Sequence, residues 1–339
     1  MEVPVCTTVY EDSCYEYKYE VICADYDLYR FHYMFPVPYC GVPPFFEPLV
    51  RNLTFNLIEV DTTSTFTSKI SIVERDTILY SNVTQRWRQM AFGDVEIEGG
   101  AIQGKRMLQS PSSQIFSKGK RFTYSNVMIA ASITNLRTSR KQANIEPNQT
   151  TSVLIGGMGV GALPIFFHDY FPDYKVDVIE IDPSVIRMAE KHFGYNASKS
   201  RLTKTQDVKQ FLEETTNKYD IIMIDAFNED GAPPGLFDQH FSDVLHHRLL
   251  DSGVLVVNTF LYKNANEPTE VWNLFRSNWS EVDVLSSLEN SGNKIVVCQK
   301  KHVDTNSVLD SAREVDNEQV EDYGFSAYNI MSYGLSNAE

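Results

Sequence analysis

The stretch Val153-Leu154-Ile155-Gly156-Gly157-Met158-Gly159-Val160-Gly161 decides the fold. An apolar strand pattern runs directly into a glycine-rich turn, and the residues that follow have the apolar spacing of a helix. Gly157, Gly159 and Gly161 would let the backbone approach a ligand closely and turn sharply into that helix. The pattern also fits a dinucleotide fingerprint that ends at Ala162, so the loop alone does not separate a nicotinamide cofactor from S-adenosylmethionine (AdoMet).

Strand and helix patterns alternate regularly after this loop. Further strands are expected at residues 175–181, 201–205, 219–225, 253–260, 282–288 and 294–300, with helices at 162–171, 183–193, 208–216, 237–250 and 267–279. Such alternation predicts a parallel sheet covered by helices on both faces. The last two strands are joined by a short turn, which predicts an antiparallel final strand. That ending is typical of AdoMet-dependent transferases rather than of nicotinamide dehydrogenases. The expected class is therefore α/β, a Rossmann-like AdoMet-dependent transferase fold with a seven-stranded sheet.

Four segments are expected along the chain. Residues 1–50 form a Cys/Tyr-rich extension. Residues 51–109 predict a small antiparallel β domain, because they hold short β-type runs at 53–60, 68–74, 77–81, 88–92 and 94–99. The Rossmann-like domain spans residues 120–302 and begins with a helix at 122–136. Residues 303–339 are an acidic C-terminal tail, which the sequence leaves open between a short helix and a disordered segment.

Charge and hydropathy narrow the partners. The 339 residues carry a formal net charge of −15, and the segment 304–339 holds eight acidic residues against the single basic Arg313. Such a surface repels nucleic acid. It suits cationic substrates such as polyamines or basic proteins, or serves only to keep the chain in solution. No apolar run is long enough to span a membrane.

Four of the five cysteines lie in the first forty residues, at Cys6, Cys14, Cys23 and Cys40. Their spacings fit no common zinc motif, and they predict two disulfides in an oxidising compartment, with three pairings open. Reduced, buried cysteines are the alternative. The histidines lie on expected helices without ligand spacing, so we expect no metal site.

Five N-x-S/T sequons are present, at Asn52, Asn82, Asn148, Asn196 and Asn278. Together with the clustered cysteines they favour a glycosylated protein that is secreted or lumenal. The first thirty residues lack the layout of a secretory signal, so a cytoplasmic location is the alternative.

Three acidic residues follow three successive strands. Glu180 lies nineteen residues after Gly161, the spacing at which a carboxylate accepts both ribose hydroxyls. Asp207 and Asp225 follow the next two strands. Ligands bind at the carboxyl ends of open parallel sheets, so we expect these carboxylates to line one crevice with the glycine loop. Asp207 also fits a helix N-cap, and the two roles are compatible.

These motifs resemble those of the spermidine synthase superfamily. The resemblance rests on six segments: GAIQG at 100–104, FTYSNVM at 122–128, GGMGVG at 156–161, VIEID at 178–182, QDV at 206–208 and YDIIMIDAFNEDGAPPGLF at 219–237. The resemblance implies that Gln103, the glycine loop, Glu180 and Asp207 hold AdoMet or decarboxylated AdoMet. It implies that Asp225 is the base that helps deprotonate an amine, and that Tyr124 borders the acceptor pocket. It also carries the expectation of a homodimer.

Two positions depart from the family pattern. Asn126 stands where the family has a glutamate, and Asn228 stands where it has a second aspartate. Polyamines carry several positive charges, and losing two carboxylates would forfeit charge-assisted hydrogen bonds of roughly 1.5–3 kcal/mol each. We therefore place Asn126 and Asn228 on the acceptor side and expect a methyltransferase-like member that transfers a methyl or aminopropyl group to a small-molecule amine or a protein.

Three alternatives stay open at this point. A genuine spermidine synthase would need other acids to replace the two that are missing. A catalytically inactive, secreted relative would use the fold as a binding scaffold, for which the altered acceptor residues argue. A nicotinamide-dependent oxidoreductase would fit the glycine loop but would leave Asp207 and Asp225 without a purpose.

Overall fold

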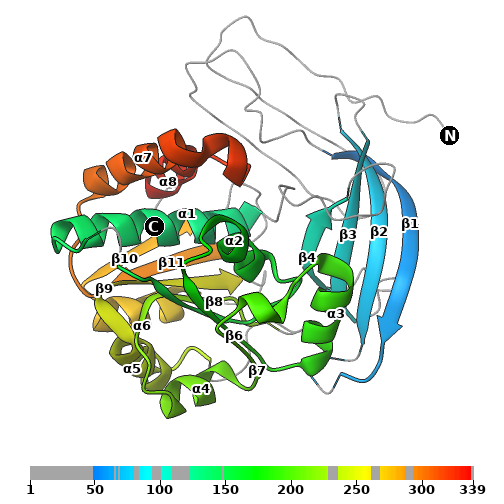
Figure 1. Cartoon of the computed structure of the whole chain (residues 1–339), viewed down its shortest axis with the longest axis horizontal. Coiled ribbons are helices and arrows are strands. Elements are labelled where there is room, and N and C mark those ends of the chain that lie inside the picture. Colours follow the sequence, from blue (N-terminus) through cyan, green and yellow to red (C-terminus); the bar gives the residue numbers. More distant parts are fainter. Residues whose placement is uncertain are drawn as a thin grey trace, which may run out of the picture. The chain divides into compact units, whose positions relative to one another are not determined.

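The computed structural model describes residues 49–64, 66–67, 69–79, 84–93, 101–108, 123–146, 149–227, 236–260, 268–286 and 293–336 (Figure 1). The chain divides into two units between Pro48 and Leu49. The description below concerns the second unit. The four clustered cysteines and Asn228 lie outside the described residues, so their predicted roles stay predictions.

The first sheet is antiparallel and has the order β1-β2-β3-β4. Its strands are β1 Leu49–Asp61, β2 Ile70–Leu79, β3 Thr84–Phe92 and β4 Ala101–Met107. Strand β2 is continuous across two runs that the sequence predicted as separate strands. The polar residues between these runs, Arg75 and Asp76, stay in register with β3. There Asp76 pairs with Arg86 across the sheet, and their side chains form an ion pair at 2.7 Å. The expected strand at 94–99 lies outside the described residues.

The second sheet has seven strands in the order β10-β11-β9-β8-β5-β6-β7. They are β5 Ser152–Gly156, β6 Lys175–Glu180, β7 Leu202–Thr205, β8 Tyr219–Ile224, β9 Leu249–Phe260, β10 Glu281–Ser286 and β11 Asn293–Gln299. Strands β5 to β9 pair in parallel, and β11 runs antiparallel to both of its neighbours. The predicted seven-stranded α/β fold with an antiparallel last strand is confirmed.

Helices cover both faces of this sheet, as Figure 1 shows. They are α1 Thr123–Gln142, α2 Ala162–Tyr170, α3 Pro183–Phe193, α4 Val208–Glu214, α5 Gln239–Arg248 and α6 Pro268–Asn278. Successive strand residues face opposite layers. In β5, Val153 and Ile155 pack with α1, α2 and α3, whereas Leu154 packs with α4, α5 and α6. Because the strands are apolar on both sides, the sheet is the centre of two hydrophobic cores.

The acidic segment at the end of the chain forms two helices, α7 Thr305–Tyr323 and α8 Ala327–Ser336. Val308 and Ala312 of α7 are buried, and they belong to the hydrophobic core that α7 shares with α1. Acidic residues of α7 form ion pairs with α1, among them Glu318 with Arg137 at 2.6 Å. A helical face of apolar residues therefore fixes this segment to the domain, while Asp310, Glu314 and Glu318 are exposed.

The carboxyl ends of helices α1 and α5 differ from the sequence prediction. Helix α1 continues six residues beyond the expected end at residue 136, to Gln142. Helix α5 stops at Arg248, and Leu249 begins β9 instead of ending the helix. The reason is that Leu249 is fully buried and pairs with Tyr219 at the start of β8. Among the described helices, none is long and apolar enough to cross a membrane.

Two sequon asparagines have described side chains. Asn196 is exposed, and its carboxamide oxygen accepts a hydrogen bond from the Ser198 amide at 3.0 Å. Asn278 is half-buried, and its Nδ2 donates to Asp243 at 2.7 Å. Glycosylation modifies the side-chain amide nitrogen of asparagine. At Asn278 this nitrogen already donates to Asp243, whereas Asn196 is exposed.

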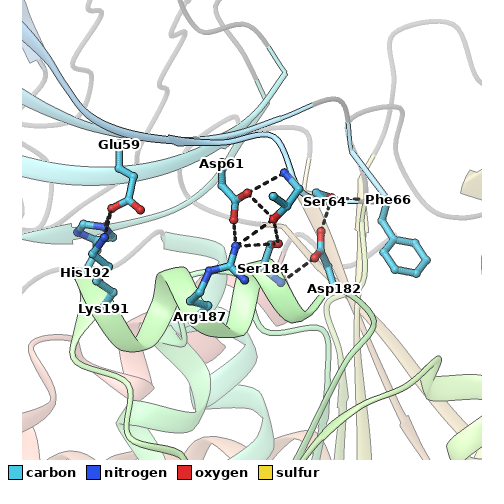
Figure 2. A network of polar contacts seen from close by, with 10 residues as sticks. Glu59, Asp61, Ser64, Phe66, Asp182, Ser184, Arg187, Lys191 and His192 are labelled. Carbon is cyan, nitrogen blue, oxygen red and sulfur yellow. Dashed lines mark hydrogen bonds and ion pairs between the residues drawn. The ribbon is translucent and has the colours of Figure 1, made fainter.

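Polar contacts dock the first sheet on helix α3 (Figure 2). Glu59 accepts hydrogen bonds from Lys191 and His192, each at 2.6 Å. Asp61 binds Arg187, and Ser64 in the following loop donates to Asp182. Because Asp182 lies two residues after Glu180, this network fixes the first sheet beside the carboxyl edge of the second sheet.

Candidate functional site

The glycine loop between β5 and α2 is a backbone structure that side chains would disrupt. Gly157, Gly159 and Gly161 have φ angles of 86°, 51° and 75°, which L-residues with a Cβ rarely adopt. A Cβ at Gly157 would lie 2.1 Å from the carbonyl oxygen of Asp225, and one at Gly159 would lie 2.9 Å from that of Gln103. The loop therefore contacts β4 and the end of β8 through bare backbone.

Glu180 closes the other side of this loop. Its Oε2 accepts a hydrogen bond from the Met158 amide at 2.8 Å, and its Oε1 accepts one from the Asp182 amide at 3.0 Å. Burial raises the pKa of Glu180 to about 7, although these backbone amides act in the opposite direction. The Ile181 amide is a third backbone donor to this carboxylate. A carboxylate offers about four lone-pair sites, so Glu180 keeps capacity for one further donor such as a ribose hydroxyl.

The strand register brings the predicted acids to one edge of the sheet. Gly156 pairs with Ile179 on one side and Ile224 on the other, and Glu180 pairs with Thr205. Asp207 and Asp225 follow Thr205 and Ile224 by two residues and one residue, so all three carboxylates lie at the same end. This arrangement satisfies the geometric condition for a shared crevice.

Asp207 is exposed and caps helix α4. Its Oδ1 accepts a hydrogen bond from the Gln210 amide at 3.0 Å. The capping role considered from the sequence is thus present, and a capping carboxylate keeps a free oxygen for a ligand.

Asp225 is held between two elements. Asn258 in β9 donates from Nδ2 to the Asp225 Oδ1 at 2.8 Å, and Tyr124 in α1 forms a second side-chain hydrogen bond with the same carboxylate. Burial raises the pKa of Asp225, and both hydrogen bonds partly offset the rise. The pKa of the Tyr124 hydroxyl is raised well above its usual value by burial and then by the Asp225 charge. Tyr124 therefore stays protonated and can donate.

A small open hollow lies where these parts meet. Its lining comes from β4, α1, the glycine loop, α2 and the end of β8: Gln103, Gly104, Lys105, Tyr124, Ser125, Met158, Val160, Ala162, Leu163 and Asp225. Gln103, Tyr124 and Asp225 were expected from the sequence on these walls. Glu180 and Asp207 lie at the same sheet edge but do not line this hollow.

Two predicted acceptor-side residues have different outcomes. Asn126 is half-buried, and its buried Oδ1 has no hydrogen-bond partner among the residues that the structure describes. Asn228 lies outside the described residues. Among the described residues, no group of three or more His, Cys, Asp and Glu side chains gathers at metal-binding distance.

Sequence reasoning missed Asn258 and Lys105. Asn258 ends the buried run GVLVVN in β9, and a polar residue at the carboxyl end of a fifth parallel strand was a usable signal. Lys105 gave no such signal, because its place in the hollow depends on how β4 packs against the second sheet and its helices. Its ammonium lies 4.8 Å from the centre of the Trp87 ring.

Comparison with known proteins gives the same class. Residues 139–285 match the family model of the spermine/spermidine synthase domain. A polyamine aminopropyltransferase of Vibrio vulnificus is 27% identical over 183 residues, which cover 53% of this chain and 60% of that protein. The eEF1A lysine and N-terminal methyltransferase of Mus musculus is 32% identical over 117 residues, 32% of this chain and 17% of that protein. The chain thus spans less than two thirds of these relatives.

Two solved structures share the fold. Human Methyltransferase-like protein 13, solved in complex with SAH (S-adenosylhomocysteine), aligns with a TM-score of 0.50 and 25% identity over 57% of this chain and 90% of that chain. A probable spermidine synthase from Corynebacterium glutamicum aligns with a TM-score of 0.53 and 14% identity over 76% of this chain and 86% of that chain. The fold is the Rossmann-like fold of AdoMet-dependent transferases.

The matched domain narrows this class to one kind of relative. The chain is similar to proteins of the spermidine synthase superfamily, both aminopropyltransferases and methyltransferases. Its curated relatives are either aminopropyltransferases or methyltransferases.

Proposed function

We propose that this protein binds AdoMet and transfers its methyl group to an amine nitrogen. The observation that carries the proposal is the Asp225 carboxylate, which is held at the edge of the glycine loop in a hollow shared with Tyr124 and Gln103. A carboxylate beside a backbone cradle can bring an amine to a bound sulfonium.

The nucleotide half of the site supports the binding step. The glycine loop brings backbone to the sheet edge, and in this proposal the Glu180 carboxylate beside it accepts a ribose hydroxyl. Asp207 stands at the next strand end, where an adenine edge would lie. Gln103 contributes from β4 on the opposite wall. In the Methyltransferase-like protein 13 structure, the bound ligand is SAH, the product that methyl transfer from AdoMet leaves.

The chemistry needs one base and an aligned nucleophile. The amine nitrogen attacks the methyl carbon, the carbon–sulfur bond breaks, and its electron pair stays on sulfur to give SAH. The nitrogen loses one proton, which Asp225 accepts directly or through water. The raised pKa of Asp225 makes it a better base than a surface aspartate.

Aminopropyl transfer is the second candidate. The family model and the Vibrio vulnificus relative favour it, because both concern polyamine synthesis. Asn126 and Asn228, which replace two acids of the family pattern, favour methyl transfer instead. A site with fewer carboxylates is less suited to a doubly charged amine and better suited to a single lysine or N-terminal amine.

The deciding experiment compares two donors. The protein is titrated calorimetrically with AdoMet and with decarboxylated AdoMet. Each donor is then incubated with the protein and with putrescine, spermidine or lysine-containing peptides. We expect preferential AdoMet binding and release of SAH with an acceptor 14 Da heavier per transfer. Preference for decarboxylated AdoMet with release of methylthioadenosine would establish aminopropyl transfer. AdoMet binding without turnover would favour a binding scaffold, and NADH binding without AdoMet binding would contradict the proposal.

A further inference from the structure

We propose that Asn258 is a positioning residue that sets the orientation and the proton affinity of Asp225. The proposal rests on the function proposed above and goes beyond it, because Asn258 was not among the residues that the motifs single out. Its side chain lies in β9, the strand beside β8, and reaches the residue that follows β8.

The geometry holds the Asp225 carboxylate from two sides. Asn258 Nδ2 donates to Asp225 Oδ1 at 2.8 Å from β9, and Tyr124 bonds the same carboxylate from α1. The backbone amide of Asp225 donates to the Gly156 carbonyl at 2.8 Å, which fixes the main chain as well. A carboxylate tied at the backbone and at the side chain keeps one direction toward the hollow.

The orientation of the Asn258 amide is also fixed. Asn258 is 3% exposed, and within the described part of the chain its buried Oδ1 has no hydrogen-bond partner. Turning the amide over would place that oxygen against Asp225 Oδ1, and two acceptors repel each other. Nδ2 therefore faces Asp225 whenever the carboxylate is ionised.

A merely structural residue at this position would not need an amide. An unpartnered buried oxygen costs stability, and the neighbouring strand residues Val256 and Val257 show that apolar side chains fill this strand. An amide at position 258 is explained if its N–H stabilises the anion at Asp225. Burial raises the pKa of Asp225, and the Asn258 hydrogen bond keeps that rise in check.

Other groups around Asp225 also bear on its titration. Tyr124 faces it from α1, and Lys105 shares the hollow from β4. Lys105 and Asp225 are the charged side chains in the lining of this hollow, within the part of the chain that the structure describes. A substitution in β9 changes neither Tyr124 nor Lys105, so variants of Asn258 isolate the contribution of Asn258 to the pKa of Asp225.

The test uses the full chain with Asn258→Leu and Asn258→Asp. Both remove the N–H donor, so the acidic limb of the kcat/KM profile should move upward by about one pH unit, and kcat should fall about tenfold to a hundredfold. Asn258→Asp is nearly isosteric and should move the limb further, since a second carboxyl group faces Asp225. The Kd for AdoMet should stay within about twofold, because Asn258 does not line the hollow.

Thr259→Val is the matched control. Thr259 is the next residue in β9, is also buried, and donates from Oγ1 to the Lys294 carbonyl at 2.8 Å. Its loss should lower thermal stability and leave the pH profile in place. Variants of Asn258 that lower stability in the same way without moving the profile would show a structural role only and overturn the proposal.

A second readout does not need turnover. The pKa of Asp225 is followed by NMR of aspartate labelled with ¹³C at the carboxyl carbon, with Asp225→Asn giving the assignment. It should rise in Asn258→Leu relative to the unchanged protein, and an unchanged pKa would refute the inference. Absence of AdoMet binding by the unchanged protein would instead refute the proposed function, so the two failures are distinguishable.

Discussion

The two halves of the candidate site are built from different materials. The proposed nucleotide half is mainly backbone: glycines with positive φ and the Met158 amide, which donates to the buried Glu180 carboxylate. The acceptor half consists of the side chains of Tyr124, Asp225 and Asn258, which come from α1, the end of β8 and β9. AdoMet binding should therefore be lost when the backbone shape changes, and transfer should be lost when the acceptor side chains lose their chemical groups.

The largest effect is expected at Gly157, and it tests the backbone half. In Gly157→Ala the new Cβ would meet the Asp225 carbonyl at 2.1 Å while φ stays at 86°. Relief requires moving the loop or the end of β8, so we expect a loss of several kcal/mol of unfolding free energy and at least a hundredfold weaker AdoMet binding. Thermal unfolding and calorimetry measure both.

Gly194→Ala is the matched control for that substitution. Gly194 has a φ of 76°, and a Cβ there would have no neighbour within 4 Å. Only the left-handed conformation is penalised, so the cost should be about 1–2 kcal/mol with unchanged AdoMet affinity. Equal effects at the two glycines would contradict the view that close approach, rather than φ alone, makes Gly157 necessary.

Asp225→Asn tests the chemical half. The substitution keeps the size of the side chain and removes the base, so the transfer rate should fall about 10²-fold to 10⁴-fold. AdoMet binding should change little, because the backbone half is untouched. Rate measurements under single-turnover conditions separate the two steps. A variant that loses AdoMet affinity and keeps its rate would reverse the roles assigned to the two halves.

Glu180 links pH to the backbone half. Its pKa of about 7 lies above that of an unfolded glutamate, so its protonation stabilises the free protein below pH 4.5, and this contribution is lost as pH rises through about 7. Ribose hydroxyls need the ionised form. AdoMet should therefore bind up to tenfold more weakly for each pH unit below 7, with proton release measurable by calorimetry in two buffers.

The control for this pH dependence is Glu180→Gln, which has no titrating group. Its AdoMet affinity should be lower and nearly independent of pH between 5.5 and 8. A pH dependence that persists in Glu180→Gln would assign the proton to another group.

The smallest effect is expected at Asp207, which tests whether its two roles coexist. Asp207→Ala removes the N-cap of α4 and should cost about 1 kcal/mol of stability. Asp207→Ser keeps a capping oxygen and removes the charge, so stability should be retained. Weaker AdoMet binding in both variants would support an adenine contact, whereas loss confined to the alanine variant would leave only the cap.

The sequence predicted the backbone half better than the acceptor half. The glycine loop, Glu180 and the cap at Asp207 lie within or next to patterns that a strand and the following turn impose on neighbouring residues. Asn258 was missed, and the contact of Lys105 with the hollow could not be found, because these residues lie far along the chain from Asp225. Their meeting depends on strand order and on sheet docking.

The chain by itself determined the elements, their alternation and the edge of the sheet at which polar residues gather, because apolar periodicity and strand ends are local properties. Tertiary structure alone decided that Asp225 has two hydrogen-bond partners from separate elements, that Glu180 is buried enough for its pKa to reach about 7, and that β4 closes the hollow. Burial and side-chain contacts arise only when distant segments pack, so no local pattern encodes them.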